Sequence, residues 1–210
     1  MIALLISALA FASAGLAIFA DYRRERYLVY VSKPLTMLLI ILAALRAGEP
    51  LSQFYRYSIV AGLGCSSVGD IFLMLPQKRF MEGLVSFLVA HLFYIAAFLS
   101  GMTIRFSALP LLLLLLYAII MLRMLFPHLG KMKLPVLIYI LVITATAWIA
   151  LERFLQIKEI KTLLAFSGAL FFVISDSSLA LNRFVRKSEY AQAFILSTYF
   201  SAQWLIAMSI

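Results

Sequence analysis

The sequence has few charged residues and lacks the side-chain sets on which many common catalytic and metal sites are built. Only 13% of its 210 residues are charged, about half the share of a soluble domain. Two histidines are too few for a multi-histidine metal site, and the single cysteine, Cys65, excludes an internal disulfide. The chain also lacks a Gly-x-Ser-x-Gly elbow, a His-Glu-x-x-His pair, a Cys-x-x-Cys pair and a Walker loop. We therefore expect neither a metal nor a cofactor.

Apolar residues are abundant instead. They make up 65% of the chain, and the mean hydropathy is +1.05. Stretches of about 20 apolar residues recur along the chain, and each is long enough to cross a hydrocarbon layer about 30 Å thick. Every backbone polar group in lipid needs an internal partner, so such spans are helices. The sequence thus predicts an all-α fold, a polytopic membrane bundle.

We expect eight transmembrane helices in a single domain, 1–210. Their approximate spans are 1–20, 27–46, 57–75, 81–100, 107–126, 134–151, 161–181 and 190–210. The first stretch lacks a basic start, which favours a membrane span over a signal peptide.

The net charge of +9 fits a membrane protein with basic loops. Ten Lys and Arg residues lie in the first, third, fifth and seventh loops, against six in the even loops. This excess predicts odd loops in the cytoplasm and both termini outside, in an integral protein of the bacterial inner membrane. Basic loop residues contact anionic lipids, and no basic-aromatic surface indicates a nucleic-acid partner. The sequence gives no indication of an oligomeric state.

Two of the nine acidic residues, Asp70 and Asp176, lie well inside apolar spans. A carboxylate at such a position costs about 2.5–3.5 kcal/mol on the insertion scale. Each lies about five residues from the odd-loop end of its span, and Lys33 lies about six residues from the same side, roughly 8–9 Å deep. This common depth indicates one buried site. The alternatives are a polar pair that holds helices together and a Lys33 side chain that reaches the headgroups.

Other polar residues lie at helical spacing on neighbouring spans. His91 and Tyr94 share one face of the fourth span, and Tyr199 and Gln203 share one face of the eighth. Ser66 lies one turn before Asp70 and is placed to hydrogen-bond it, with a bond to its own backbone as the alternative.

The two aspartates also lie in similar segments. A glycine precedes each by eight residues, Gly62 before Asp70 and Gly168 before Asp176. A basic-Phe pair follows each in the next loop. With four spans per half, the two halves would have the same orientation, which indicates two parallel four-helix repeats.

Several of these motifs, in this order, resemble the YhhN-like, or lysoplasmalogenase, family. They are Lys33-Pro34-Leu35, Ser66-Ser67-Val68-Gly69-Asp70, the Phe87 to Tyr94 segment with His91, Gly168 to Ser177 with Asp176, and Tyr199 to Gln203. The resemblance covers nearly the whole chain. It implies an eight-span membrane hydrolase that cleaves the vinyl ether bond of lysoplasmalogens, releasing a fatty aldehyde and glycerophosphoethanolamine or glycerophosphocholine. The expected partner is therefore a lysophospholipid substrate, within membrane lipids.

The residues fit that chemistry. A vinyl ether is protonated on carbon to an oxocarbenium ion, which water then captures. Our hypothesis is that Asp70 and Asp176 are catalytic, one as a neutral acid and the other as an ionised stabiliser, as in glycosidases. The sequence does not assign the two roles. The expected binding or supporting residues are Lys33, Ser66, His91, Tyr94, Ser175, Tyr199 and Gln203.

Paired intramembrane carboxylates also occur in proton- or ion-coupled transporters, which is the main alternative function. The absence of clearly broken helices argues against it. An intramembrane aspartyl protease is a second alternative. It is disfavoured because Ser67 replaces the first glycine of a Gly-x-Gly-Asp signature and three spans separate the aspartates. A purely structural role is the third.

Overall fold

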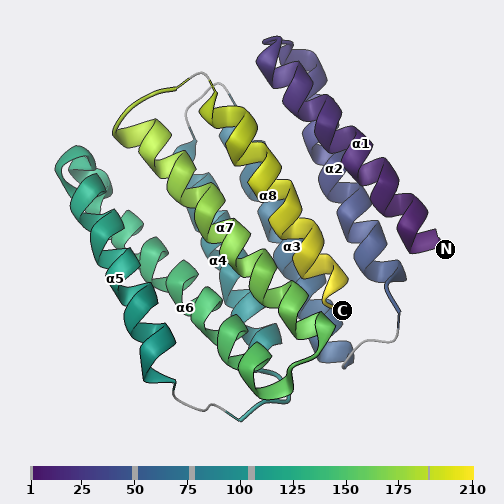
Figure 1. The fold of residues 1–210 in the computed structure, drawn as a ribbon. Helices are drawn as coiled ribbons and strands as arrows, with labels where there is room; N and C mark the ends of the chain where they lie inside the picture. The colour runs from purple at the N-terminus through teal and green to yellow at the C-terminus, as the bar shows by residue number, and fades with distance from the viewer. Residues whose placement is uncertain (1, 49–51, 76–78, 104–106, 189) are drawn as a thin grey trace.

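The protein is a bundle of long α-helices lying side by side, seen in a computed structural model (Figure 1). The structure describes residues 2–48, 52–75, 79–103, 107–188 and 190–210. Within these ranges every regular element is helical, which confirms the predicted all-α class. The helices are α1 (Ile2–Tyr22), α2 (Arg26–Arg46), α3 (Gln53–Met74), α4 (Phe80–Leu99), α5 (Ala108–Leu125), α6 (Lys133–Ile157), α7 (Ile160–Phe184) and α8 (Ala191–Met208), with two 3-10 turns, η1 (Phe126–His128) and η2 (Gly130–Met132), between α5 and α6.

Helix α8 lies at the centre of the bundle. It packs against α7 along the chain and also against α1, α2 and α3. Helix α5 lies at the outer edge in Figure 1, where it packs mainly on α6. The central position of α8 brings side chains from both halves of the sequence within reach of its polar residues.

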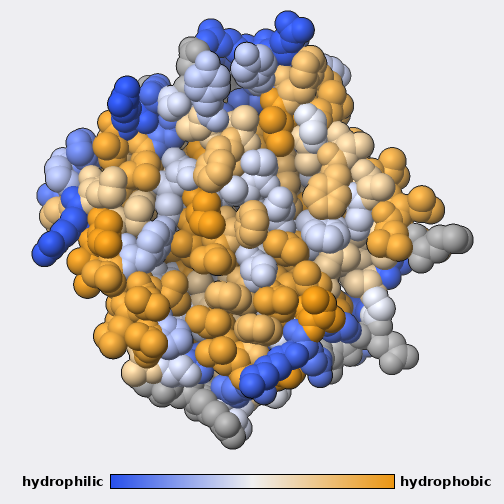
Figure 2. Space-filling model, in the orientation of Figure 1, coloured by the Kyte–Doolittle hydropathy of each residue, from blue (hydrophilic) through white to orange (hydrophobic). Residues whose placement is uncertain are grey.

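The surface matches a membrane-embedded bundle. A largely hydrophobic middle separates two ends that carry most of the hydrophilic residues (Figure 2). Seven helices, α1 to α7, are long and apolar enough to cross a membrane. Helix α8 falls outside that group because it carries polar residues such as Gln192, Thr198, Tyr199 and Gln203, of which the last three are buried in the bundle. The protein is an integral membrane protein, while the eighth span and the predicted orientation stay predictions.

Helix α6 extends beyond the span expected for it. The sixth span was expected to end at residue 151, whereas α6 continues to Ile157 and buries Glu152 and Arg153. The Glu152 carboxylate accepts hydrogen bonds from the backbone N–H (2.9 Å) and hydroxyl (3.1 Å) of Ser107. Arg153 Nη1 donates to the carbonyls of Phe98 (2.7 Å) and Ser100 (2.6 Å). These two charged residues therefore tie α6 to the ends of α4 and α5 rather than marking a loop.

Helices α7 and α8 approach very closely at Gly168. A Cβ atom there would lie 2.9 Å from the backbone oxygen of Ala202 and 2.7 Å from Cγ1 of Ile206. Small residues at helix contacts allow such backbone approach in membrane proteins. This contact fixes α7, which carries Asp176, against α8, which carries Tyr199.

Candidate active site

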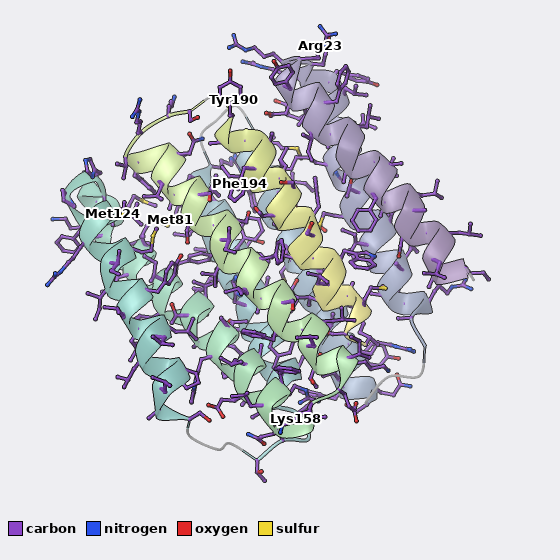
Figure 3. All side chains as sticks on the ribbon, viewed as in Figure 1. Arg23, Met81, Met124, Lys158, Tyr190 and Phe194 are labelled. Atoms are coloured by element: carbon purple, nitrogen blue, oxygen red, sulfur yellow. The ribbon has the colours of Figure 1, made fainter. Side chains whose placement is uncertain are left out.

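A large polar cavity opens at the end of the bundle where Figure 3 labels Arg23 and Tyr190. Its volume is about 870 Å³, and residues from α1, α2, α3, α4, α7 and α8 line it. Its inner part is lined by Lys33, Asp70, Ser175, Asp176 and Tyr199, and its outer part includes Arg24, Arg26, Arg183, Lys187 and Tyr190. Both intramembrane aspartates thus border one cavity, which we call the polar cavity.

Asp70 is held by residues from two other helices. The residue is 3% exposed, and Nζ of Lys33 on α2 lies 3.1 Å from Oδ1. The Tyr199 hydroxyl on α8 donates to Oδ2 at 2.5 Å. This ion pair contradicts the alternative in which the Lys33 side chain reaches the headgroups, since the buried side chain points to Asp70 instead.

A proline and a glycine lie next to the two residues of this pair. Pro34 follows Lys33 inside α2 and has no N–H to donate, so the helix ladder lacks one bond there. Gly69 precedes Asp70, and a Cβ at Gly69 would lie 2.8 Å from Cε2 of Phe87 on α4. The absence of a side chain at Gly69 therefore lets α3 lie close against α4.

Asp176 has a different set of partners. The hydroxyl of Tyr139 on α6 donates a hydrogen bond to its Oδ2. Next to it, Ser177 is hydrogen-bonded to the hydroxyl of Tyr117 on α5. Among the described residues, no lysine or arginine forms an ion pair with Asp176. Of the two carboxyl groups, only Asp70 therefore has a buried cation as partner.

Three of the expected supporting residues form a separate polar cluster that does not line the polar cavity. The Tyr94 hydroxyl donates to Oε1 of Gln203 at 2.8 Å and lies 3.4 Å from Oγ of Ser66. The expected bond between Ser66 and Asp70 is therefore wrong, because Ser66 faces α4 and pairs with Tyr94. The cluster links α3, α4 and α8 at a fully buried level of the bundle.

The other two expected residues, Ser175 and His91, lie outside this cluster. Ser175 lines the polar cavity, but its hydroxyl donates to the carbonyl of Ile195 at 3.0 Å and so connects α7 to α8. His91 lines no described cavity and is enclosed by aromatic rings, with Phe172 at 4.5 Å and Tyr139 at 5.8 Å between centroids. Neither ring nitrogen of His91 has a hydrogen-bond partner among the described residues.

Sequence reasoning missed Tyr139 and Tyr117. Both lie in long apolar runs, and no motif in the sequence singles them out. The available indication was chemical, because a buried tyrosine hydroxyl needs a hydrogen-bond partner and an apolar helix supplies none. Which side chain each hydroxyl meets depends on how α5 and α6 are rotated against α7, and the sequence does not give that rotation.

Known proteins resemble this chain along most of its length. Residues 28–210 match the YhhN family. A protein of Escherichia coli O6:H1 with the name "uncharacterized membrane protein YhhN" is 33% identical over 199 residues, which is 94% of each chain. The human protein named lysoplasmalogenase TMEM86A is 36% identical over 184 residues, 84% of this chain and 74% of the relative. Lysoplasmalogenase TMEM86B of Sus scrofa is 34% identical over 84% of this chain and 72% of its own length. No solved structure matches the chain.

Proposed function

The chain belongs to the YhhN family, and we propose that it is a membrane-embedded hydrolase that cleaves the vinyl ether bond of lysoplasmalogens. The products are a fatty aldehyde and glycerophosphoethanolamine or glycerophosphocholine. Relatives named lysoplasmalogenase, at 34–36% identity, support the substrate class. The site supplies the chemical argument.

The observation that carries the proposal is the unequal surroundings of two carboxyl groups on one cavity. Lys33 places a buried positive charge beside the Asp70 carboxylate. Among the described residues Asp176 has no cation as partner and accepts a hydrogen bond only from a tyrosine hydroxyl, so its surroundings stabilise a negative charge less than those of Asp70 do. We assign Asp176 as the acid and Asp70 as the carboxylate.

The reaction begins with a proton transfer to carbon. Asp176 gives its proton to the vinyl carbon farther from the ether oxygen, and the electron pair of the double bond forms the new C–H bond. The positive charge then lies on the other vinyl carbon and the ether oxygen as an oxocarbenium ion. The negative charge of Asp70 stabilises this cation across the cavity, as carboxylates do in glycoside hydrolysis.

Water completes the reaction. It adds to the cationic carbon and loses a proton, which restores the acid and gives a hemiacetal. The hemiacetal breaks its bond to the glycerol oxygen, which takes up the hydroxyl proton, and the aldehyde forms. One water is consumed overall, and no oxidant, metal or cofactor takes part in this scheme.

Two tyrosines orient the carboxyl groups in this scheme. Tyr199 holds the Asp70 carboxylate against Lys33, and Tyr139 holds the Asp176 carboxyl group at the edge of the polar cavity. Arg183 and Lys187 at the cavity mouth supply positive charge toward a phosphate headgroup. The guanidinium of Arg183 is itself supported by the Phe80 ring, 3.9 Å from its centroid.

The direct test is an assay with two lipids. Purified protein is incubated with lysoplasmenylethanolamine or with the saturated alkyl ether lysolipid that has the same headgroup. We expect aldehyde and glycerophosphoethanolamine only from the vinyl ether. No aldehyde from a well-folded preparation, or equal cleavage of both lipids, would contradict the proposal. Transport of lysolipid across proteoliposomes without cleavage would favour the transporter instead.

A further inference from the structure

A second, apolar cavity lies beside the polar one. It has a volume of about 50 Å³ and lies between α4, α5, α6 and α7, with Leu73 of α3 also in its lining, and we call it the apolar slot. Its walls include Leu84, Met121, Val136, Ile140, Ile143 and Ala180. Lysine, arginine and glutamate are absent from the residues that line it in the described part of the chain.

The apolar slot joins the polar cavity at Asp176. The two cavities share this residue together with Leu73, Phe80, Phe87 and Leu179. The four polar side chains of the slot are already paired with one another, Tyr139 with Asp176 and Tyr117 with Ser177. Away from these pairs the slot offers no hydrogen-bonding side chain, so its remaining length suits a hydrocarbon and not a headgroup.

The lining of the slot favours a hydrocarbon chain. Most of its walls are apolar side chains, and an alkyl chain needs no polar partner. Lipid tails are as apolar as the leucine and isoleucine side chains of the walls, so a chain enters from the bilayer without a large solvation cost. The slot therefore favours a hydrocarbon chain, and its limited volume makes it sensitive to chain size.

We propose that the apolar slot binds the hydrocarbon chain of the lysolipid and thereby places the bond to be cleaved at Asp176. This inference rests on the proposed function. In a lysoplasmalogen the double bond joins the first two carbons of the chain, directly below the glycerol. With the chain in the apolar slot and the headgroup in the polar cavity, that bond lies where the two cavities meet. A single apolar slot also matches a lysolipid, which has a single hydrocarbon chain.

Chain-length selectivity tests the inference. Ala180 lies on the slot wall, and A180F fills part of the slot with a ring. The matched control A12F makes the same change on the exposed face of α1, away from both cavities. We expect A180F to lower kcat/KM for a long-chain lysoplasmenyl lipid at least about tenfold relative to a short-chain one. The parent protein and A12F should have the same dependence of kcat/KM on chain length. An unchanged profile in folded A180F would overturn the inference.

A second experiment does not depend on turnover. An alkyl ether lysophospholipid with a diazirine at the chain end is bound to the parent, A180F and A12F proteins, irradiated, and mapped by peptide mass spectrometry. We expect labelling near Met121 and Ile140 in the parent and A12F, and its loss in A180F. Labelling confined to outer helix faces, or unaffected by A180F, would overturn the inference. Slot labelling in a protein that releases no aldehyde would retain the slot and reject the hydrolase.

Discussion

Nζ of Lys33 lies 3.1 Å from Oδ1 of Asp70, and both side chains are buried between α2 and α3. Removal of one partner from a buried ion pair leaves an uncompensated charge, which costs about 3–5 kcal/mol. Because this pair borders a polar cavity, we expect K33M to lower the free energy of unfolding by about 3 kcal/mol, the low end of that range. Unfolding in detergent measures the change.

The double variant K33M/D70N separates charge from packing. It removes both charges, so it should recover part of the stability lost in K33M, and K33R should stay close to the parent. Equal stability of K33M and the parent protein would show that the ion pair does not hold the two helices as described.

Tyr139 is expected to act on the reaction through Asp176. The Y139F variant loses the hydroxyl that donates to Oδ2 and keeps the ring that packs against His91. Asp176 becomes a carboxylate as it gives up its proton, and a hydrogen bond to a charged group contributes about 1.5 kcal/mol or more, so kcat should fall about tenfold with little change in KM. Y117F is the control, because its hydroxyl pairs with Ser177 instead. Equal effects of Y139F and Y117F on kcat would contradict the role given to Tyr139.

The packing of α3 on α4 leads to a prediction about stability. A Cβ at Gly62 would lie 2.3 Å from Cε1 of Tyr94, a ring atom held by the bond to Gln203. We expect G62A to lose about 1–3 kcal/mol through overpacking. Gly64, two residues along the same helix, has no such atom within 4 Å, so G64A should retain the stability of the parent or gain slightly. Thermal unfolding of both variants in the same detergent decides the matter, and a G62A protein as stable as G64A would refute the close packing.

The general features of the fold follow from composition, while the contacts between helices do not. Eight apolar segments with short loops predict the helices, and the helix bounds match within a few residues except at α6. That exception has a physical reason, because Glu152 and Arg153 look like loop residues until their partners at Ser107, Phe98 and Ser100 are known. The sequence alone does not show that these residues are hydrogen-bond partners.

Some features of the site can likewise be predicted from the sequence, while others cannot. A common depth for Lys33, Asp70 and Asp176 follows from counting residues along each span, and the structure brings all three to one cavity. The side-chain direction of Ser66 and the partners of Tyr139 depend on helix rotation, and residue counting does not give rotation. The parallel repeat and the catalytic roles stay predictions.

The position of proton transfer gives a chemical prediction. If Asp176 protonates carbon, a reaction in D₂O should place one deuterium on the aldehyde carbon next to the carbonyl. Mass spectrometry of the aldehyde, trapped at once as a hydrazone, measures this label. An aldehyde incubated with the protein in D₂O is the control for later exchange. An aldehyde without deuterium would rule out protonation at carbon from an exchangeable acid.

The central claim is that Asp70 and Asp176 act together in one cavity, and the most direct measurement is aldehyde release by D70N and D176N. General acid catalysis contributes about 10²–10⁴-fold, so D176N should lose at least about a hundredfold in kcat while it still binds the diazirine lysolipid. D70N should lose activity to a similar extent, because the oxocarbenium ion then lacks the carboxylate that stabilises it and the charge of Lys33 is left without its partner. Near-parental aldehyde release by either folded variant would contradict the account.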